Sequence, residues 1–209
     1  MKKFKYTIAL FTVLISLNAC TKDDPIPVDD QEEIGVAKLI FTEVEREIHG
    51  DHAHYHDIEG AHADTIIFSG SSMLPPVGAH LHLSNTKSYR LQLVATDFAG
   101  RETQNTFIDR DDIHQAFITG APEGALIYEY GDKKTDGTAV NVGVKGYLTV
   151  QKTSASFPLR YVLRHLNPGV KASVTAADWN NPDFTKFSGD NDLDLKVDLH
   201  LVDADSQGH

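Results

Sequence analysis

The chain has 209 residues, a single cysteine and a formal net charge of −11. One cysteine excludes a disulfide framework, so the fold must depend on an apolar core or on a bound metal. The acidic balance argues against nucleic acid and anionic membrane as partners, because both repel such a chain and the sequence has no basic patch that would offset the charge.

The first 19 residues have the pattern of a secretory signal peptide. Three lysines precede an apolar run over residues 6–17, which is too short to be read as a membrane-spanning helix. Residues 17–20, Leu-Asn-Ala-Cys, resemble a bacterial lipobox, in which the signal is cleaved before the cysteine and the thiol is lipidated. We therefore expect Cys20 to carry a lipid anchor, which is the protein's contact with the membrane.

Residues 20–34 predict a solvated tether. Directly after the cysteine, Thr-Lys-Asp-Asp (21–24) resembles the export signal that sends lipoproteins of the Bacteroidota to the outer face of the outer membrane. The segment 21–33 contains two prolines and six acidic residues, a composition typical of an extended linker. Loss of the signal peptide removes three lysines and lowers the net charge from −11 to about −14, which favours cationic ligands.

Residues 35–203 predict one all-β domain, followed by a disordered tail at 204–209. The clearest strand is 193–202, in which leucine and valine alternate with polar residues, so that one face is apolar. Turn residues separate the strands, and a short helical turn is predicted at 108–115. The pattern indicates an antiparallel, immunoglobulin-like β-sandwich of eight or nine strands. The segments with strand character are 36–45, 65–69, 88–96, 115–120, 125–131, 145–153, 158–165 and 193–202.

The most unusual segment is 49–62, HGDHAHYHDIEGAH, with five histidines in fourteen positions. Residues two apart in a strand share a face at about 6.6 Å, so His52, His54 and His56 should project together. Two such imidazoles can converge on one ion at about 2.1 Å each, and a third ligand completes most of a tetrahedron. An exposed polar ribbon is the alternative interpretation. The predicted metal ligands are His49, His52, His54, His56, His62, His80 and His82.

The expected ion is Zn²⁺, with Cu²⁺ or Ni²⁺ as alternatives, because neutral imidazole suits these metals. Soft sulfur ligands are nearly absent, since Met73 is the only methionine left after signal cleavage. Nearby acidic residues could complete the coordination or orient the imidazoles. These are Asp51, Asp57, Glu59 and Asp64.

The segment HAHYHD (52–57) nearly matches the H-x-H-x-D-H motif of metallo-β-lactamase-like hydrolases, but its last two positions are exchanged. No nucleophile elbow, H-E-x-x-H helix or phosphate-binding loop occurs in the sequence. We therefore expect a binding protein and keep a zinc hydrolase as an alternative.

Four residues outside the histidine-rich segment allow other interpretations. His114 and His165 are expected to donate hydrogen bonds to backbone carbonyls, and axial ligation of haem is the alternative. Trp179 and Phe184 could form a stacking platform for a glycan, although a tryptophan in a loop is more often a core anchor. A glycan-binding or purely structural receptor-accessory protein is therefore the competing hypothesis.

The segments HQAFITG (114–120) and LRHLNP (163–168), together with the general pattern over 36–202, resemble small surface lipoproteins of the Bacteroidota found beside TonB-dependent outer-membrane receptors. The resemblance implies an outer-membrane location facing the exterior and a TonB-dependent receptor as partner. The chain departs from that pattern at the histidine-rich 49–62 and at His-Leu-His (80–82), where specificity would lie. We thus expect a monomeric, metal-binding accessory protein that serves metal uptake.

Overall fold

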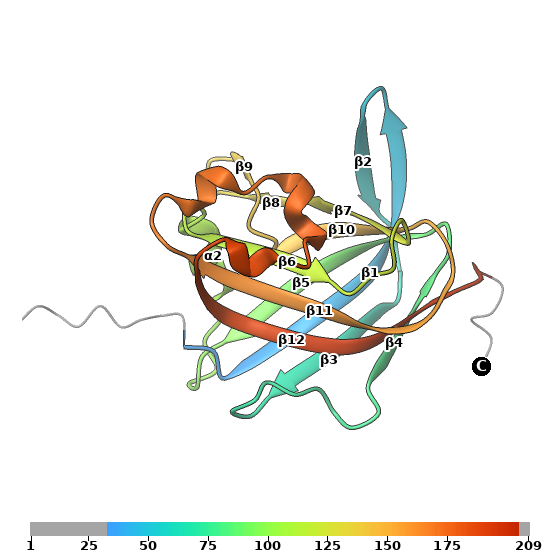
Figure 1. The fold of residues 1–209 in the computed structure, drawn as a ribbon. Helices are drawn as coiled ribbons and strands as arrows, with labels where there is room; N and C mark the ends of the chain where they lie inside the picture. The colour runs from blue at the N-terminus through green and yellow to red at the C-terminus, as the bar shows by residue number, and fades with distance from the viewer. Residues whose placement is uncertain (1–32, 205–209) are drawn as a thin grey trace, which may run out of the picture. The chain divides into compact units, whose positions relative to one another are not determined.

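The computed structural model describes residues 33–204 (Figure 1), and the all-β prediction is confirmed. The predicted signal peptide, most of the tether and most of the tail lie outside the described residues. The strands are β1 (Val36–His49), β2 (His52–Asp57), β3 (Ala63–Ser69), β4 (His80–Ser84), β5 (Ser88–Thr96), β6 (His114–Thr119), β7 (Leu126–Tyr130), β8 (Asp132–Lys133), β9 (Ala139–Val140), β10 (Lys145–Val150), β11 (Ser154–Leu166) and β12 (Gly189–Val202).

The strands form two large sheets and a small hairpin. The six-stranded sheet has the order β2-β1-β5-β10-β7 with β3 also paired to β1, and the four-stranded sheet has the order β4-β12-β11-β6. Strands β8 and β9 pair only with each other. The pairing of β12 with β4 is parallel, whereas the other pairings in the described residues are antiparallel. The strands outnumber the predicted eight or nine, and this topology does not confirm an immunoglobulin-like arrangement.

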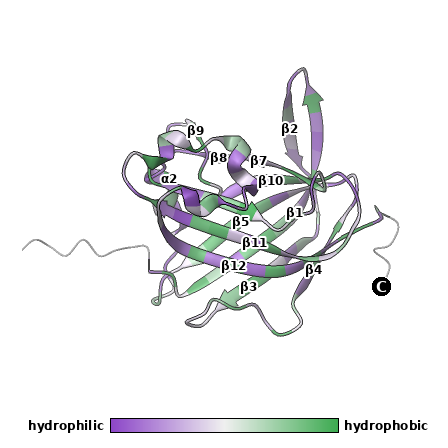
Figure 2. Cartoon of the chain, in the orientation of Figure 1, coloured by the Kyte–Doolittle hydropathy of each residue, from purple (hydrophilic) through white to green (hydrophobic). Residues whose placement is uncertain are grey.

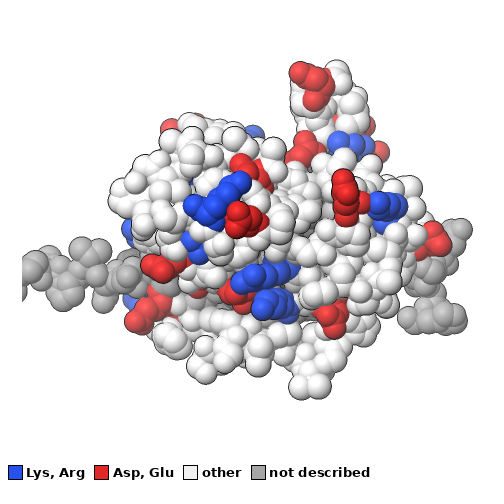
Figure 3. Space-filling model, in the orientation of Figure 1, with Lys and Arg blue, Asp and Glu red and all other residues white. Residues whose placement is uncertain are grey.

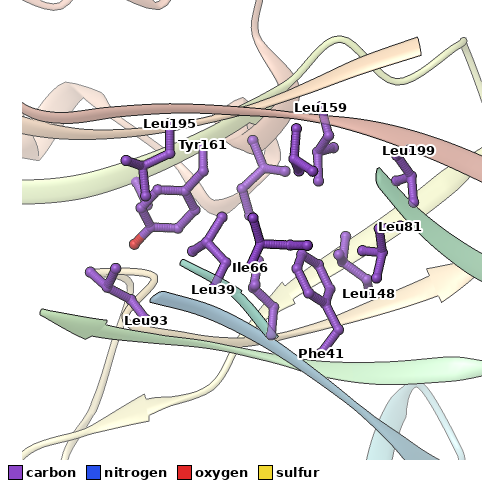
Figure 4. Packing of buried hydrophobic residues seen from close by; sticks show 14 of the residues in the cluster. Leu39, Phe41, Ile66, Leu81, Leu93, Leu148, Leu159, Tyr161, Leu195 and Leu199 are labelled. Atoms are coloured by element: carbon purple, nitrogen blue, oxygen red, sulfur yellow. The ribbon is translucent and has the colours of Figure 1, made fainter. Parts of the chain in front are cut away.

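The core lies between the inner faces of the two large sheets. Leu39 and Phe41 of β1 and Leu195 and Leu199 of β12 belong to one buried cluster, shown from close by in Figure 4. Green and purple residues alternate along the strands in Figure 2, as expected when one side chain in two faces the core. The predicted apolar face of 193–202 is therefore confirmed, because its leucines and Val197 are all buried.

Helical segments are short. The helix α2 (Gln104–Asp109) begins earlier than the predicted turn at 108–115. Helical structure cannot extend to residue 115, because β6 pairs with β11 from His114 onward. Three 3-10 helices lie between β11 and β12, namely η1 (Val170–Ser173), η2 (Ala176–Asn180) and η3 (Phe184–Lys186). In the described part of the chain, no helix has the length and apolar character needed to cross a membrane.

Strand β1 is long enough to leave its sheet. Its pairing with β3 ends at Thr42 and its pairing with β5 ends at Val44, whereas its pairing with β2 continues from Val44 to His49. Residues 45–56, here called the histidine hairpin, therefore extend beyond the sheet as a two-stranded ribbon (Figure 1). The ribbon closes through a tight turn in which Gly50 has a positive φ of 66°.

Candidate metal centres

One face of the histidine hairpin is lined with metal-ligand side chains. Directly opposed residues of an antiparallel pair point to the same side of the sheet. The register therefore places six such side chains on one face, through the pairs His49–His52, Glu47–His54 and Glu45–His56. All six residues are exposed. This pairing places the three histidines of β2 on one face, as expected from their spacing in the strand.

The other face of the hairpin is fixed against the six-stranded sheet. The ring of Tyr55 stacks on Tyr147 of β10, with centroids 3.9 Å apart and planes 2° from parallel. The Tyr55 hydroxyl donates to Glu129 of β7 and accepts a hydrogen bond from Arg46. These contacts hold the base of the hairpin, so its histidine face is turned away from the body and left open to solvent.

The ligand atoms on this face lie close together but do not converge on one point. Nε2 of His49 lies 3.1 Å from Oε2 of Glu47, and Nε2 of His56 lies 3.8 Å from the same oxygen. The hydrogen bond from His49 and the charge of His56 lower the pKa of Glu47, which keeps this carboxylate ionised in mild acid. Because the ligand atoms do not converge, the exposed rings must rotate to enclose an ion. Acidic side chains also lie at the hairpin's tip, as Figure 3 shows.

The structure places His80 and His82 apart from the hairpin, in the four-stranded sheet. Parallel pairing of β4 with β12 sets His82 opposite His200, and their rings stack with centroids 5.3 Å apart. The ring centroids of His80 and His82 are 5.0 Å apart. His80 also lines an open hollow of about 540 Å³ together with His200 and Asp198. The expected His80–His82 pair thus gains a third histidine, His200, which sequence reasoning placed only on a polar strand face.

The remaining predicted ligand, His62, belongs to neither group. It lies in the connection between β2 and β3, with Nε2 3.3 Å from Oδ1 of Asp64 and 85% of its side chain exposed.

A buried group joins residues from three neighbouring strands. His114 of β6 and His165 of β11 are directly opposed, and their rings meet edge to face with centroids 4.9 Å apart. The carboxylate of Asp192 in β12 lies between them, with Oδ2 3.4 Å from His114 Nε2 and Oδ1 3.8 Å from His165 Nδ1. One ligand atom from each residue lies within 4.8 Å of the other two, so this group could hold a metal ion. Within residues 33–204 it is the one group of three that meets this criterion.

A β-bulge puts Asp192 in this position. Leu163 pairs with Leu193, but the next residue, Arg164, pairs with Asn191, so Asp192 is an extra residue without a partner in the register. A bulge of this kind changes the direction of a side chain. Sequence reasoning missed Asp192, which lies just before the predicted strand 193–202. The sole signal was the unbroken run of polar residues before Leu193.

The bulge is held by a buried arginine. The guanidinium of Arg164 donates to Oδ1 of Asn191 and to the carbonyls of Phe187 and Gly189. Gly189 has a φ of +145°, and a Cβ there would lie 2.1 Å from the carbonyl oxygen of His165. Only glycine therefore allows β12 to begin this close to the site.

A lysine cross-links the start of β6 to a neighbouring loop. Nζ of Lys171 in η1 donates to the carbonyls of His114 and Asn141. Burial lowers the pKa of Lys171 to about 8, an effect that Asp111 and Asp132 partly offset. The backbone of His114 is thus fixed from outside the sheet, while its side chain faces inward.

The fold argues against two alternative interpretations of the sequence, haem ligation by His114 and His165 and a glycan-stacking platform. His114 donates from Nδ1 to the carbonyl of Arg110, which confirms its predicted backbone hydrogen bond. Its ring is fully buried and in edge contact with His165, so no haem fits between the two. Phe184 is also buried, against Phe117, which excludes it from a glycan-stacking platform. Trp179 packs against Tyr128 at the edge of the core.

Comparison with models of protein families, with curated proteins and with solved structures found no match.

Proposed function

We propose that this protein is an outer-membrane lipoprotein that binds a transition metal at the histidine hairpin and serves a TonB-dependent receptor in metal uptake. One observation carries the proposal: four histidines and two glutamates occupy one exposed face of a hairpin that extends beyond the sheet. A face lined with ligands on a projecting ribbon can take up an ion without opening the core.

Zinc is the ion that fits this ligand set best. Imidazole nitrogen and carboxylate oxygen bind Zn²⁺ at about 2.0–2.2 Å, and the borderline-soft ion does not need sulfur. The carboxylate of Glu47 lies between two imidazoles and can either ligate the ion or orient them. The net charge of about −14 after signal cleavage adds a general attraction for cations.

Replacing His52, His54 and His56 together with alanine is expected to remove tight Zn²⁺ binding at the hairpin, with a loss of affinity of about 100-fold or more. Because an imidazole must be neutral to ligate and its reference pKa is about 6.5, the parent's binding should weaken steeply below about pH 6 and release protons. Calorimetry at several pH values measures both effects.

Ile48→Ala is the matched control for the triple variant, because Ile48 lies on the opposite face of the same hairpin. It should leave the affinity unchanged. Binding that survives in the triple variant, or that persists to about pH 4–5 as carboxylate ligands alone would allow, contradicts a histidine site.

The lipid anchor is tested separately. Cys20 lies outside the described residues, and the prediction comes from the lipobox-like sequence around it. Cys20→Ala should abolish acylation and move the protein from the membrane fraction to the soluble fraction. Membrane association that is unaffected by the change would contradict the lipoprotein assignment.

A further inference from the structure

We propose that His114, His165 and Asp192 form a second metal site, which holds one divalent transition-metal ion inside the four-stranded sheet. The site is independent of the histidine hairpin. Asp192 of the buried group and His200 of the surface cluster are eight residues apart in β12. They are therefore about 26 Å from each other. The buried group is thus also separate from the surface cluster of His80, His82 and His200.

The hydrogen bond of His114 to a backbone carbonyl indicates which ring nitrogen faces Asp192. A backbone carbonyl can only accept a hydrogen bond, so the contact between Nδ1 and the Arg110 carbonyl means that Nδ1 carries a proton. The second nitrogen, Nε2, then presents either a lone pair or another proton to the carboxylate of Asp192. A lone pair on Nε2 and a carboxylate oxygen are both acceptors and repel each other. A cation between them, either a proton or a metal ion, relieves this repulsion.

The spacing favours the metal. A charge-assisted N–H···O hydrogen bond is about 2.7–2.9 Å long, whereas His114 Nε2 lies 3.4 Å from Asp192 Oδ2. Two ligand atoms that bind one tetrahedral ion at about 2.1 Å are about 3.4 Å apart. Oδ2 of Asp192 is also buried and accepts no hydrogen bond from the described residues. A carboxylate oxygen in this state has free capacity for a cation.

The surroundings have the features of a metal centre. The hydrogen bond from Nδ1 of His114 to a carbonyl sets the tautomer in which Nε2, the nitrogen that faces Asp192, carries the lone pair, as in many metal-bound histidines. The third ligand, His165, has 34% of its side chain exposed, so an ion can enter from that side and the ring can turn to complete the coordination. Two imidazoles and one carboxylate suit Zn²⁺ or Fe²⁺ and leave a position open for water.

The test uses the full chain with His49, His52, His54 and His56 changed to alanine, so that the hairpin no longer contributes. After treatment with a chelator, this protein should bind one equivalent of Co²⁺ or Zn²⁺. The Co²⁺ form should show the visible absorption of a four-coordinate ion, and the metal should raise the melting temperature because it links β6, β11 and β12.

Asp192→Asn keeps the shape of the side chain and removes its charge. It should weaken the affinity for Co²⁺ about 100-fold or more and abolish the visible bands. Asp190→Asn is the matched control, since it makes the same change at a neighbouring exposed position of β12. Circular dichroism of the metal-free variants verifies that each one folds.

Two outcomes would overturn the proposal. If the hairpin-free protein binds neither Co²⁺ nor Zn²⁺, the cation between His114 and Asp192 is a proton. If Asp190→Asn weakens binding as much as Asp192→Asn, the metal is attracted by general acidity. Neither outcome concerns the hairpin, whose own binding is measured by its triple variant.

Discussion

Phe41→Ala is expected to lower the free energy of unfolding by about 3–5 kcal/mol, the usual cost of removing a buried aromatic ring. Phe41 is fully buried in the part of β1 that is paired on both sides, by β3 and by β5. Its loss leaves a cavity between the two sheets that the surrounding strands cannot close. Urea denaturation followed by circular dichroism measures the change.

A second residue of the same strand provides the comparison. Ile48 is 57% exposed and lies in the part of β1 that projects with the hairpin. Ile48→Ala should change the free energy of unfolding by no more than about 0.5 kcal/mol. Equal effects at Phe41 and Ile48 would mean that the hairpin is part of the core and not a separate binding element.

Acidification should stabilise the protein through Asp132. This carboxylate is only 2% exposed and accepts hydrogen bonds from the backbone N–H groups of Gly143 and Lys145. Burial outweighs these bonds and raises the pKa of Asp132 from 3.8 to about 6. Between those values the folded state binds a proton that the unfolded state has released, so the free energy of unfolding falls as the pH rises.

The Asp132→Asn variant isolates this effect because its side chain does not titrate. Relative to the variant, the parent should lose about 2 kcal/mol of stability between pH 4 and pH 6. This is the larger part of the total effect of about 3 kcal/mol, since each pKa unit corresponds to about 1.4 kcal/mol. Denaturation curves of both proteins at several pH values give the difference. A difference that is independent of pH would show that the carboxylate is not desolvated as the fold indicates.

Asp136, in the turn that follows β8, is the matched control. The backbone N–H of Thr138 donates to its carboxylate and lowers its pKa. Its contribution to stability is therefore present above the unfolded value of 3.8 and is lost as the pH falls. The parent should lose stability relative to Asp136→Asn on acidification, which is the opposite direction from Asp132.

The fold class was predictable because it depends on local alternation. A strand such as β12 buries every second residue, so its leucines can be recognised without knowledge of its neighbours. The topology was less accessible. The parallel pairing of β4 with β12 joins residues more than 100 positions apart, and neither strand carries a signal for its partner. The short β8 and β9 have too few residues for any period to be visible.

The histidine hairpin was largely within reach of the sequence for the same reason. The spacing of His52, His54 and His56 is a property of one strand, and strand geometry alone puts them on one side. The position of Glu45 and Glu47 on the same face could be recognised only from the register between β1 and β2. The stack of Tyr55 on Tyr147, which leaves the histidine face open, could be recognised only from the tertiary structure of the whole sheet.

The buried group was beyond the sequence. His114, His165 and Asp192 are far apart in the chain, and each by itself is an ordinary polar residue at the end of a strand. Their meeting depends on the pairing of β11 with both of its neighbours and on a bulge that departs from regular alternation. Local alternation thus determined the β fold and the exposed histidine face, whereas long-range strand register alone decided which buried polar side chains share a site, because contacts between distant strands have no local period.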